Sequence, residues 1–518
     1  MTISKRKKDD KREREDPMAQ KYVMACDLGT SGLKAVIVSM EGEVLASTTE
    51  PYALYTRAPL YAEQSPEEYW QAICRSFRSV RGENFAAEDC AGIAFGTQWK
   101  GIIPVDSDGN ALRDCIIWMD KRAAAEAQEI NEKLKFAERG LRLYAAADYW
   151  SKLYWLRKHE PEIYDKCAYI LDTNGYLKMR ATGNVVCDIT NSYTRTLSPQ
   201  RQAFYEEVLT ACDIDMAKFP PICLSTDKVG SLTAVAAADL GLPEGTPVFG
   251  GCCDIPAMVI GSGRSELGGT HFYLGTSGWV AGVVPREPNE TYRPPLDAEN
   301  DIEFLGIGVQ VGRGTDWMLN LLYPEETKTL GKGIFEFLNK ELESVPAGSD
   351  RLLATPWAFG ARKPLASTSA RAVFFNVNDK HTRAHMAKAY FEGICYMLRQ
   401  NRERLYKAWP QELESITVCG GGAANPHWMQ AMADIMHTDI IIPEDAQGRG
   451  AIGVACTALI GLGAVESYAT LKDHVRAAKV YHPRPENFAE YDLLYDQFKK
   501  LYASLEDIFV TLNGPITG

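Results

Sequence analysis

The pentapeptide Leu-Gly-Thr-Ser-Gly occurs twice in this chain, at 28–32 and at 274–278. Each copy follows one apolar run and precedes another, and the two copies lie about half a chain apart. A short loop of this composition between two apolar runs favours a β-hairpin. An internal repeat on this scale therefore predicts two related halves, each of which opens with a hairpin.

The segments around the two loops predict a mixed α/β architecture in each half. Strands are expected in the first half at 21–27, 33–40, 44–52 and 90–96. A helix is expected after Ser65, which is a good N-cap and is followed by Pro66. The second half repeats the order, with strands around the loop at 271–284, a helix at 380–406, a strand at 415–419 and a helix at 425–436.

The glycine-rich stretch 261–268 predicts the boundary between the halves, which gives lobes at 21–264 and 265–518. Its glycines are either a hinge or ordinary loop residues. Residues 1–20 are highly charged and lack an apolar core, which predicts a disordered tail and excludes a secretory signal.

The composition argues against nucleic-acid and membrane partners. A net charge of −12 argues against a nucleic-acid ligand. The apolar stretch 451–465 is too short and too rich in glycine to cross a bilayer, so it predicts a buried helix and no membrane partner. Thirteen cysteines without metal-ligand spacing predict free thiols in a reducing cytoplasm.

The two Gly-Thr-Ser-Gly loops expose backbone N–H groups and hydroxyls that suit phosphate oxygens. The candidate phosphate ligands of the first loop are Thr30, Ser31 and Lys34, where Lys34 is alternatively a solvated lysine. The second loop offers Gly275, Thr276 and Ser277. The alternative is that each loop is only a tight hairpin turn.

Asp27 ends a buried strand directly before the first loop. A buried carboxylate is costly unless it is paired or binds a ligand. Mg²⁺ on a bound phosphate chain would account for it, since magnesium takes one or two carboxylates together with water and phosphate oxygens. The alternative is that Asp27 caps its own hairpin.

Two further glycine-rich segments follow strands. Gly420 to Gly422 precede Asn425, a predicted helix N-cap, and offer a flat backbone for a purine and ribose. Asp254 follows Gly250 and Gly251, and is a candidate general base for a hydroxyl that attacks a γ-phosphate. Its alternative role is that of a helix N-cap without chemistry. The chain contains no G-x-x-x-x-G-K-[ST] motif and is not a P-loop protein.

From about Lys21 to Leu501 the sequence resembles the FGGY carbohydrate kinases, and within them most closely the xylulokinases. The resemblance depends on a series of segments in a fixed order: DLGTSGLKAVIV, GTQWKGIIPVD, IIWMDKRA, GGCCDIPA, LGTSGWV, ATPWAFGARKP, HTRAHMAKAYFEGICYMLRQN and GGGAANPHWMQAMADI. It implies an α/β fold of two ribonuclease H-like, actin-type ATPase lobes with the active site in the cleft between them. It also implies ATP and Mg²⁺ as cofactors, a small-molecule sugar as acceptor, and the dimeric state that is common in the family.

The resemblance assigns roles to individual residues. Asp254 matches the catalytic base, and Asp27 would lie near Mg²⁺, with water between them. The residues implied at the nucleotide are Thr30, Ser31, Lys34, Gly275, Thr276, Ser277, Gly312, Gly421, Gly422 and Asn425. The residues implied at the sugar are Gln98, Trp99, Lys100, Asp120 and Asp254, with Trp118 and Arg122 on the same side.

One departure concerns the acceptor. Xylulokinases carry Gln-Met-His-Gly where this chain has Gln98-Trp99-Lys100-Gly101. An indole stacks on a sugar face, and an ammonium donates to hydroxyls or attracts an anion. The expected reaction is ATP-dependent phosphorylation of a terminal hydroxyl of an open-chain sugar, D-xylulose first. The alternatives are another ketose or polyol, a sugar-independent actin-like ATPase, and a catalytically idle sugar or nucleotide sensor.

Overall fold

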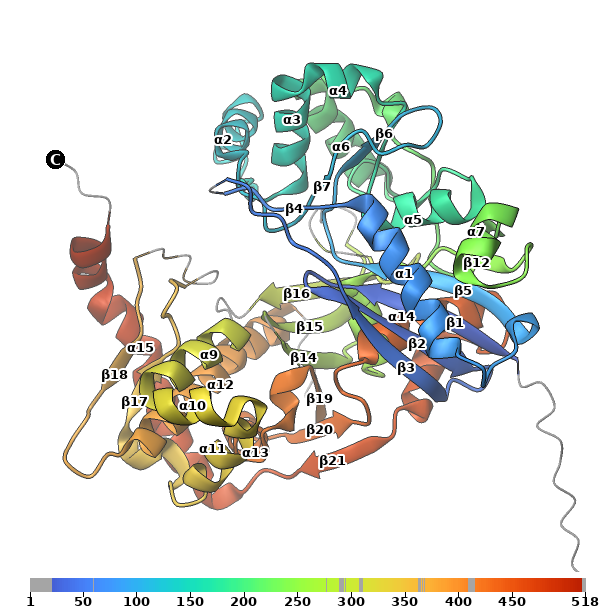
Figure 1. Cartoon of the computed structure of the whole chain (residues 1–518). Coiled ribbons are helices and arrows are strands. Elements are labelled where there is room, and N and C mark those ends of the chain that lie inside the picture. The colour runs from blue at the N-terminus through green and yellow to red at the C-terminus, as the bar shows by residue number, and fades with distance from the viewer. Residues whose placement is uncertain are drawn as a thin grey trace, which may run out of the picture.

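The structure, a computed structural model, describes residues 21–58, 60–275, 277–287, 293, 295–306, 311–361, 365, 367, 369–408 and 415–514, with only the backbone at 473 and 474. Two mixed β-sheets form its frame, and Figure 1 shows helices grouped around each of them. The α/β architecture expected from the sequence is confirmed.

The first sheet contains the hairpin around the first loop. Its strand order is β11-β12-β5-β1-β2-β3, and β13 also pairs with β5. The strands are β1 (Tyr22–Leu28), β2 (Gly32–Ser39), β3 (Val44–Pro51), β5 (Cys90–Thr97), β11 (Lys228–Ser231), β12 (Pro247–Phe249) and β13 (Cys252–Cys253). β1 pairs antiparallel with β2 and parallel with β5.

The second sheet repeats this pattern. Its order is β16-β15-β14-β19-β20-β21. The strands are β14 (Thr270–Leu274), β15 (Gly278–Pro285), β16 (Asn300–Gly306), β19 (Ser415–Cys419), β20 (Asp439–Pro443) and β21 (Ala477–Tyr481). β14 pairs antiparallel with β15 and parallel with β19, so both Leu-Gly-Thr-Ser-Gly loops connect the antiparallel strands of related sheets.

In the first half, α1 (Pro66–Arg81), α5 (Thr173–Thr182) and α7 (Ala234–Leu240) share one core with the first sheet. The other helices of this half pack on one another in a separate core: α2 (Ala124–Lys133), α3 (Tyr149–His159), α4 (Pro161–Lys166) and α6 (Pro199–Ala211). The helices of the second half are α9 (Val311–Leu322), α10 (Pro324–Leu330), α11 (Ile334–Leu342), α12 (Arg383–Ala408), α13 (Pro426–Met436) and α15 (Phe488–Asn513). Four short strand pairs complete the described fold: β4 (Glu63–Gln64) with β7 (Cys115–Ile116), β6 (Ile103–Val105) with β8 (Tyr169–Leu171), β9 (Cys187–Asp188) with β10 (Ile222–Cys223), and β17 (Leu353–Thr355) with β18 (Val373–Phe375).

The two predicted N-caps are confirmed. The side chain of Ser65 accepts a hydrogen bond from the backbone N–H of Glu68 and begins α1, with Pro66 in the first turn. The side chain of Asn425 accepts from the backbone N–H of Trp428 and begins α13. Each cap satisfies a donor that the first helical turn leaves free.

A third layer lies between the sheets and contains α8 (Asp254–Gly261) and α14 (Arg449–Gly461). Alternate residues of β1 point to opposite faces, as the period of a strand requires. Met24 and Cys26 pack into the core beneath α1, whereas Val23 and Ala25 pack into the core that contains α8 and α14. Residues of β15 enter that same central core, so one apolar cluster joins the two halves.

The helix expected at 451–465 is the buried α14, but it begins at Arg449 and ends at Gly461. Gly463, with φ of 73°, adopts the left-handed conformation that favours glycine and prevents continuation of the helix. In the part of the chain that the structure describes, no helix has both the length and the apolar character needed to cross a bilayer. All thirteen cysteines are free thiols.

Candidate active site

Asp27 and Asp254 lie at the same edge of the first sheet. Gly96 of β5 pairs with Asp27 of β1 on one side and with Cys252 of β13 on the other, and both pairings are parallel. Neighbouring strands are about 4.8 Å apart. The parallel register therefore brings Asp27 and the residue that follows β13, Asp254, to the same end of three adjacent strands.

The two carboxyl groups affect each other's protonation. Burial, and after it the negative charge of Asp27, together raise the pKa of Asp254 from 3.8 to about 7. Burial also raises the pKa of Asp27, to about 6, against the opposing effect of the Lys34 ammonium. A carboxyl group with a pKa near neutrality is suited to general-base chemistry.

The surroundings of Asp27 fit a cation. Its Oδ1 atom is buried and accepts no hydrogen bond within the described residues. Its Oδ2 atom lies so near the start of α14 that a Cβ on Gly450 would be 2.1 Å away. No cluster of three or more His, Cys, Asp or Glu side chains forms a metal site among the described residues. One orphaned carboxylate oxygen suits Mg²⁺, which takes most of its ligands from phosphate and water.

The first loop carries its predicted side chains next to Asp27. The Thr30 hydroxyl accepts from the Trp118 indole at 3.1 Å and lies 3.4 Å from Gln98 Oε1. Lys34 is not simply solvated, because its Nζ donates to both carboxylate oxygens of Asp445 from the second half, at 2.8 and 3.0 Å. Ser31 is exposed.

The second loop packs against two other glycine segments. Gly275 N donates to Ser277 O at 2.9 Å, and Gly312 N donates to Gly275 O at 3.0 Å. A Cβ on Gly420 would lie 2.5 Å from Leu274 O, so only glycine permits this approach. The structure thus brings together Gly275, Ser277, Gly312 and the 420–422 turn, while Thr276 lies outside the described residues.

Tyr273 links the second loop to the carboxyl pair. A Cβ on Gly275 would lie 2.3 Å from the Tyr273 hydroxyl oxygen. The pKa of Tyr273 is raised by burial and by the charges of Asp27 and Asp254. Both glycine loops therefore lie beside the two carboxyl groups. Asn425 uses its side-chain oxygen to cap α13, at the end of the glycine turn.

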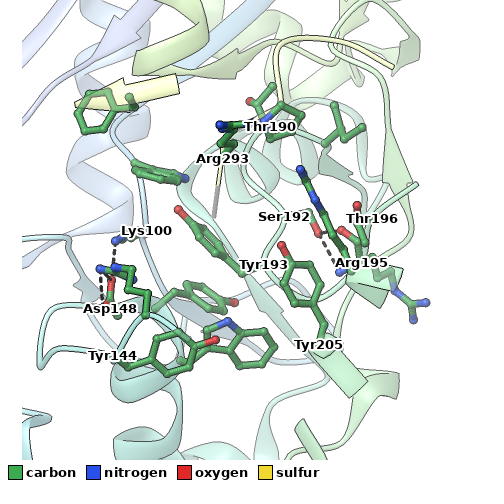
Figure 2. Close-up of a pocket in the computed structure, with 18 of the residues that line it drawn as sticks. Lys100, Tyr144, Asp148, Thr190, Ser192, Tyr193, Arg195, Thr196, Tyr205 and Arg293 are labelled. Atoms are coloured by element: carbon green, nitrogen blue, oxygen red, sulfur yellow. Dashed lines mark hydrogen bonds and ion pairs between the residues drawn. The ribbon is translucent and has the colours of Figure 1, made fainter. Parts of the chain in front are cut away.

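A cavity of about 380 Å³ opens on the neighbouring side, between the first-half helices and β16 (Figure 2). Trp99 and Lys100 line it. Gln98, Asp120 and Asp254, which the resemblance also assigned to the sugar, are not among the residues that line it. Gln98 is buried and donates to Gln64 Oε1 at 2.6 Å.

Asp120 has a structural pairing that the sequence did not predict. Its carboxylate is fully buried, accepts from Ala62 N at 2.7 Å and binds the Arg122 guanidinium at 2.6 Å. The Arg122 guanidinium in turn stacks over the Tyr61 ring. Asp120 and Arg122 therefore hold together the segments around them, and neither lines the cavity.

Two residues missed by the sequence reasoning hold the Trp99–Lys100 turn. Lys100 has φ of 66°, and the buried Lys152 donates to its carbonyl and to that of Ile117, both at 2.8 Å. Asp148 accepts from Lys100 at 2.8 Å. Burial alone would raise the pKa of Asp148, but the charges of Lys100 and Arg142 outweigh this and lower it. A lysine within the aromatic run YWSKLYWL was the only signal in the sequence.

A second missed group connects the cavity to Asp254. The buried Asp188 accepts from the backbone N–H and the hydroxyl of Thr190, and from the Ser225 hydroxyl at 2.8 Å. Thr190 lines the cavity, and its oxygen accepts from Cys253 N at 2.8 Å. The pair thereby fixes the backbone directly before Asp254. The Asp-x-Thr spacing is typical of a local side-chain turn, which gives no hint of this distant contact.

Replacing Thr190 with valine is expected to lower kcat about tenfold and to leave the KM for the nucleotide unchanged, since the acceptor for Cys253 N is lost. Steady-state kinetics measure both constants. Thr190→Ser keeps the oxygen and should retain most of the activity. Equal losses in the serine and valine variants would contradict a role for this hydrogen bond.

The raised pKa of Asp254 predicts a pH-dependent cost to stability. Between about pH 4 and 7 the folded protein retains a proton that the unfolded chain has lost, so stability is complete below pH 4 and falls as the pH rises through 7. Asp254→Asn removes this cost, which is about 4 kcal/mol at pH 8. Thermal unfolding of metal-free protein should show a higher Tm for the variant at pH 8 and no difference at pH 4. An equal difference at both pH values would contradict the prediction.

Comparison with known proteins gives a consistent result. Residues 22–261 match the model of the FGGY family of carbohydrate kinases, N-terminal domain, and residues 307–462 match its C-terminal domain. Xylulose kinase of Bacillus subtilis is 30% identical over 504 residues, which cover 95% of this chain and 99% of that protein. The crystal structure of xylulose kinase from Lactobacillus acidophilus aligns with a TM-score of 0.84 at 22% identity, covering 95% of this chain and all of that one. The structure of gluconate kinase from the same organism aligns with a TM-score of 0.82 at 23% identity, covering 94% and 98% of the two chains.

Proposed function

Because this chain belongs to the FGGY family of carbohydrate kinases, we propose that it transfers the γ-phosphoryl group of ATP to a terminal hydroxyl of an open-chain sugar, with D-xylulose as the first candidate. The relative from Bacillus subtilis supports that choice of acceptor. The observation that supports the proposal is the buried Asp254, whose pKa is raised to about 7 and which directly follows Cys253, whose N–H donates to Thr190 in the cavity lining.

In this mechanism the phosphates of ATP lie between the first loop, with Thr30, Ser31 and Lys34, and the second, with Gly275 and Ser277. Backbone N–H groups and the Lys34 ammonium hold the triphosphate. Lys34 would have to leave Asp445 to do so, which couples nucleotide binding to the contact between the halves. Thr276 is assigned to the same group from the sequence alone.

The nucleoside end would lie along the glycine turn, with Gly421 and Gly422 against the purine and ribose and Gly312 beside them. Asn425 holds this turn through its cap on α13. Asp27 is the residue that would hold Mg²⁺, through water, and the metal would neutralise charge on the phosphates. The orphaned Oδ1 atom of Asp27 supports this assignment.

The acceptor would occupy the cavity against Trp99 and Lys100. Asp254 takes the proton from the attacking hydroxyl as the oxygen bonds to the γ-phosphorus and the bond to the ADP oxygen breaks. Alignment of the two substrates supplies about 7–11 kcal/mol of barrier lowering. The base contributes about 10²–10⁴-fold in rate.

A different ketose or polyol is the second candidate acceptor, and the Trp99–Lys100 pair in the cavity favours it. A site that is built to pair specific hydroxyls discriminates by orders of magnitude among acceptors. We further propose lobes at 21–264 and 265–518, a homodimeric state and a cytoplasmic location, each from the resemblance or the composition described above.

Release of ADP in the presence of C4 to C6 ketoses, polyols and aldonates tests this function. We expect release that depends on an acceptor and is largest with one open-chain compound. ADP release that is equally fast without any acceptor would show a sugar-independent ATPase instead. Nucleotide binding without ADP release under any condition would indicate a sensor.

A further inference from the structure

The cavity beside Asp254 is strongly cationic. Its lining contains six cationic side chains and one carboxylate, namely Lys100, Arg142, Arg195, Arg201, Arg293 and Arg404 with Asp148. Figure 2 shows Lys100 and Asp148 on one side of Tyr193, and Arg195 on the other. Charges of one sign within a partly enclosed space raise the local concentration of the opposite ion.

The acids near these cations do not balance them. Asp148 is shared by Lys100 and Arg142. The buried Asp301 outside the lining is likewise shared, by Arg201 and Arg286.

The remaining three arginines have still less compensation. Among the described residues Arg293 forms an ion pair with one acid, Glu303, at 2.6 Å. Arg195 donates to the backbone carbonyls of Met216 and Phe219, which carry no net charge. Across the described part of the chain neither Arg195 nor Arg404 forms an ion pair, so the cavity retains an excess of positive charge.

Buried donors in the same lining lack acceptors. The indole N–H of Trp99, the hydroxyl of Tyr193 and the Nε of Arg201 are buried, and within the described residues none has a hydrogen-bond partner. Arg201 is only 3% exposed. Two of these three groups can only donate. An unpaired buried donor costs free energy that a ligand rich in acceptor oxygens would recover.

We propose that this cavity contains an anion subsite that binds a carboxylate or phosphate group next to the hydroxyl that is phosphorylated. The subsite rests on the proposed kinase function only for its place beside the acceptor. Thr190, which lines the cavity and accepts from Cys253 N, connects the cavity to the backbone directly before the base. The anion is either part of the acceptor, as in a polyhydroxy acid, or a free ion that binds together with a neutral sugar.

Matched acceptors separate these sources. The kcat/KM of D-xylonate is compared with those of xylitol and D-xylulose, which have the same number of carbons, and the neutral pair is assayed again with added inorganic phosphate at constant ionic strength. An acidic acceptor that is at least tenfold better locates the anion on the acceptor. A phosphate-dependent fall of at least threefold in the KM of a neutral acceptor identifies a free ion. The absence of both effects would overturn the proposal, while turnover of a neutral acceptor would leave the kinase function intact.

If no acceptor is phosphorylated, the proposed kinase function is overturned but the subsite is not. Binding measurements then test the subsite directly. Calorimetric titration of D-xylonate, xylitol and inorganic phosphate is carried out with a non-hydrolysable ATP analogue bound, so that the phosphate loops are filled. We expect an anion to bind, and its affinity to fall as salt is added. Failure of both D-xylonate and phosphate to bind would overturn the subsite.

Two substitutions on α12 provide the matched control. Arg404 and Lys407 are both exposed, but only Arg404 lines the cavity. Arg404→Met therefore removes a cation from the lining, whereas Lys407→Met removes one from the same helix outside it. The first should weaken the anion at least fivefold and leave xylitol unchanged, and the second should change neither. Arg404→Lys should restore part of the anion affinity. Equal effects of Arg404→Met and Lys407→Met would show a general charge effect and overturn the subsite.

Discussion

Replacing Asp254 with alanine is expected to lower kcat by about 10²–10⁴-fold while an ATP analogue still binds with its original affinity. No cationic side chain in the described part of the chain pairs with Asp254, and its pKa of about 7 leaves it available as a proton acceptor at neutral pH. Within the described residues its side chain accepts one hydrogen bond, from the N–H of Ile255, the next residue. Loss of the carboxylate therefore removes chemistry without breaking a distant contact.

Single-turnover phosphoryl transfer measures the rate of the chemical step, and calorimetric titration measures the affinity for the nucleotide. Asp254→Asn keeps the shape of the side chain and should be as inactive as the alanine variant. Asp215→Ala is the control, since Asp215 likewise accepts a local backbone hydrogen bond, from Ala217 N, at the start of a helical turn, and it is not among the residues that line the cavity. Asp254 itself is the first residue of α8, whose N-cap is Cys253. Turnover that survives in both Asp254 variants would assign the proton transfer to another group, and loss of nucleotide binding would assign Asp254 to the ATP site.

The sequence alone predicted the parts of the fold that depend on local pattern. The duplicated pentapeptide predicted both hairpins, and the apolar runs on either side of it predicted the strands that flank them. Ser65 and Asn425 were identified as caps because a cap depends on residues within one helical turn. The α/β class followed from the order of these elements, and the resemblance supplied the actin-type architecture that the structural neighbours confirm.

The parts that escaped prediction depend on contacts between distant segments. Asp120 and Asp254 are both acids near glycines or small residues, yet Arg122 neutralises the first, whereas no described side chain forms an ion pair with the second. Lys152 reaches the carbonyl of Lys100 across a fold that the linear sequence does not display. Tertiary packing determines which side chains of distant segments meet. The sequence therefore indicates which residues could be functional, but it does not predict their partners.

The position of the central layer, α8 and α14, was also not predictable from the sequence, because it depends on contacts between the two halves. A boundary at 264–265 assigns α14 to the second lobe, but α14 packs against β1 and β5 of the first sheet and against α8. Gly261, a candidate hinge residue, lies at this contact, and a Cβ there would be 1.8 Å from Arg449 O. Close approach of α14 is thus sufficient reason for glycine at this position.

The crossing of α8 and α14 leads to the largest expected effect on stability. Gly453 lies in the middle of α14, and a Cβ there would be 1.8 Å from Ala257 O, a backbone atom of α8 that cannot rotate away. Helix propensity alone predicts that Gly453→Ala stabilises the protein by about 1 kcal/mol. Overpacking against a backbone costs more, and we expect a net loss of about 3–5 kcal/mol.

The sign of the change in the free energy of unfolding shows whether helix propensity or overpacking dominates in Gly453→Ala. Gly333→Ala is the control, because φ there is −67° and the nearest atom to an added Cβ is 3.7 Å away. Unfolding in denaturant should show Gly453→Ala destabilised and Gly333→Ala unchanged or slightly stabilised. α8 begins at Asp254 and α14 begins beside Asp27, so a displacement of one helix from the other also moves these two carboxyl groups apart. We therefore expect Gly453→Ala to lower kcat even at temperatures below its unfolding transition. A Gly453→Ala variant that is as stable as the native chain would mean that the halves are not held at this crossing, and that the central core tolerates a shift of one helix past the other.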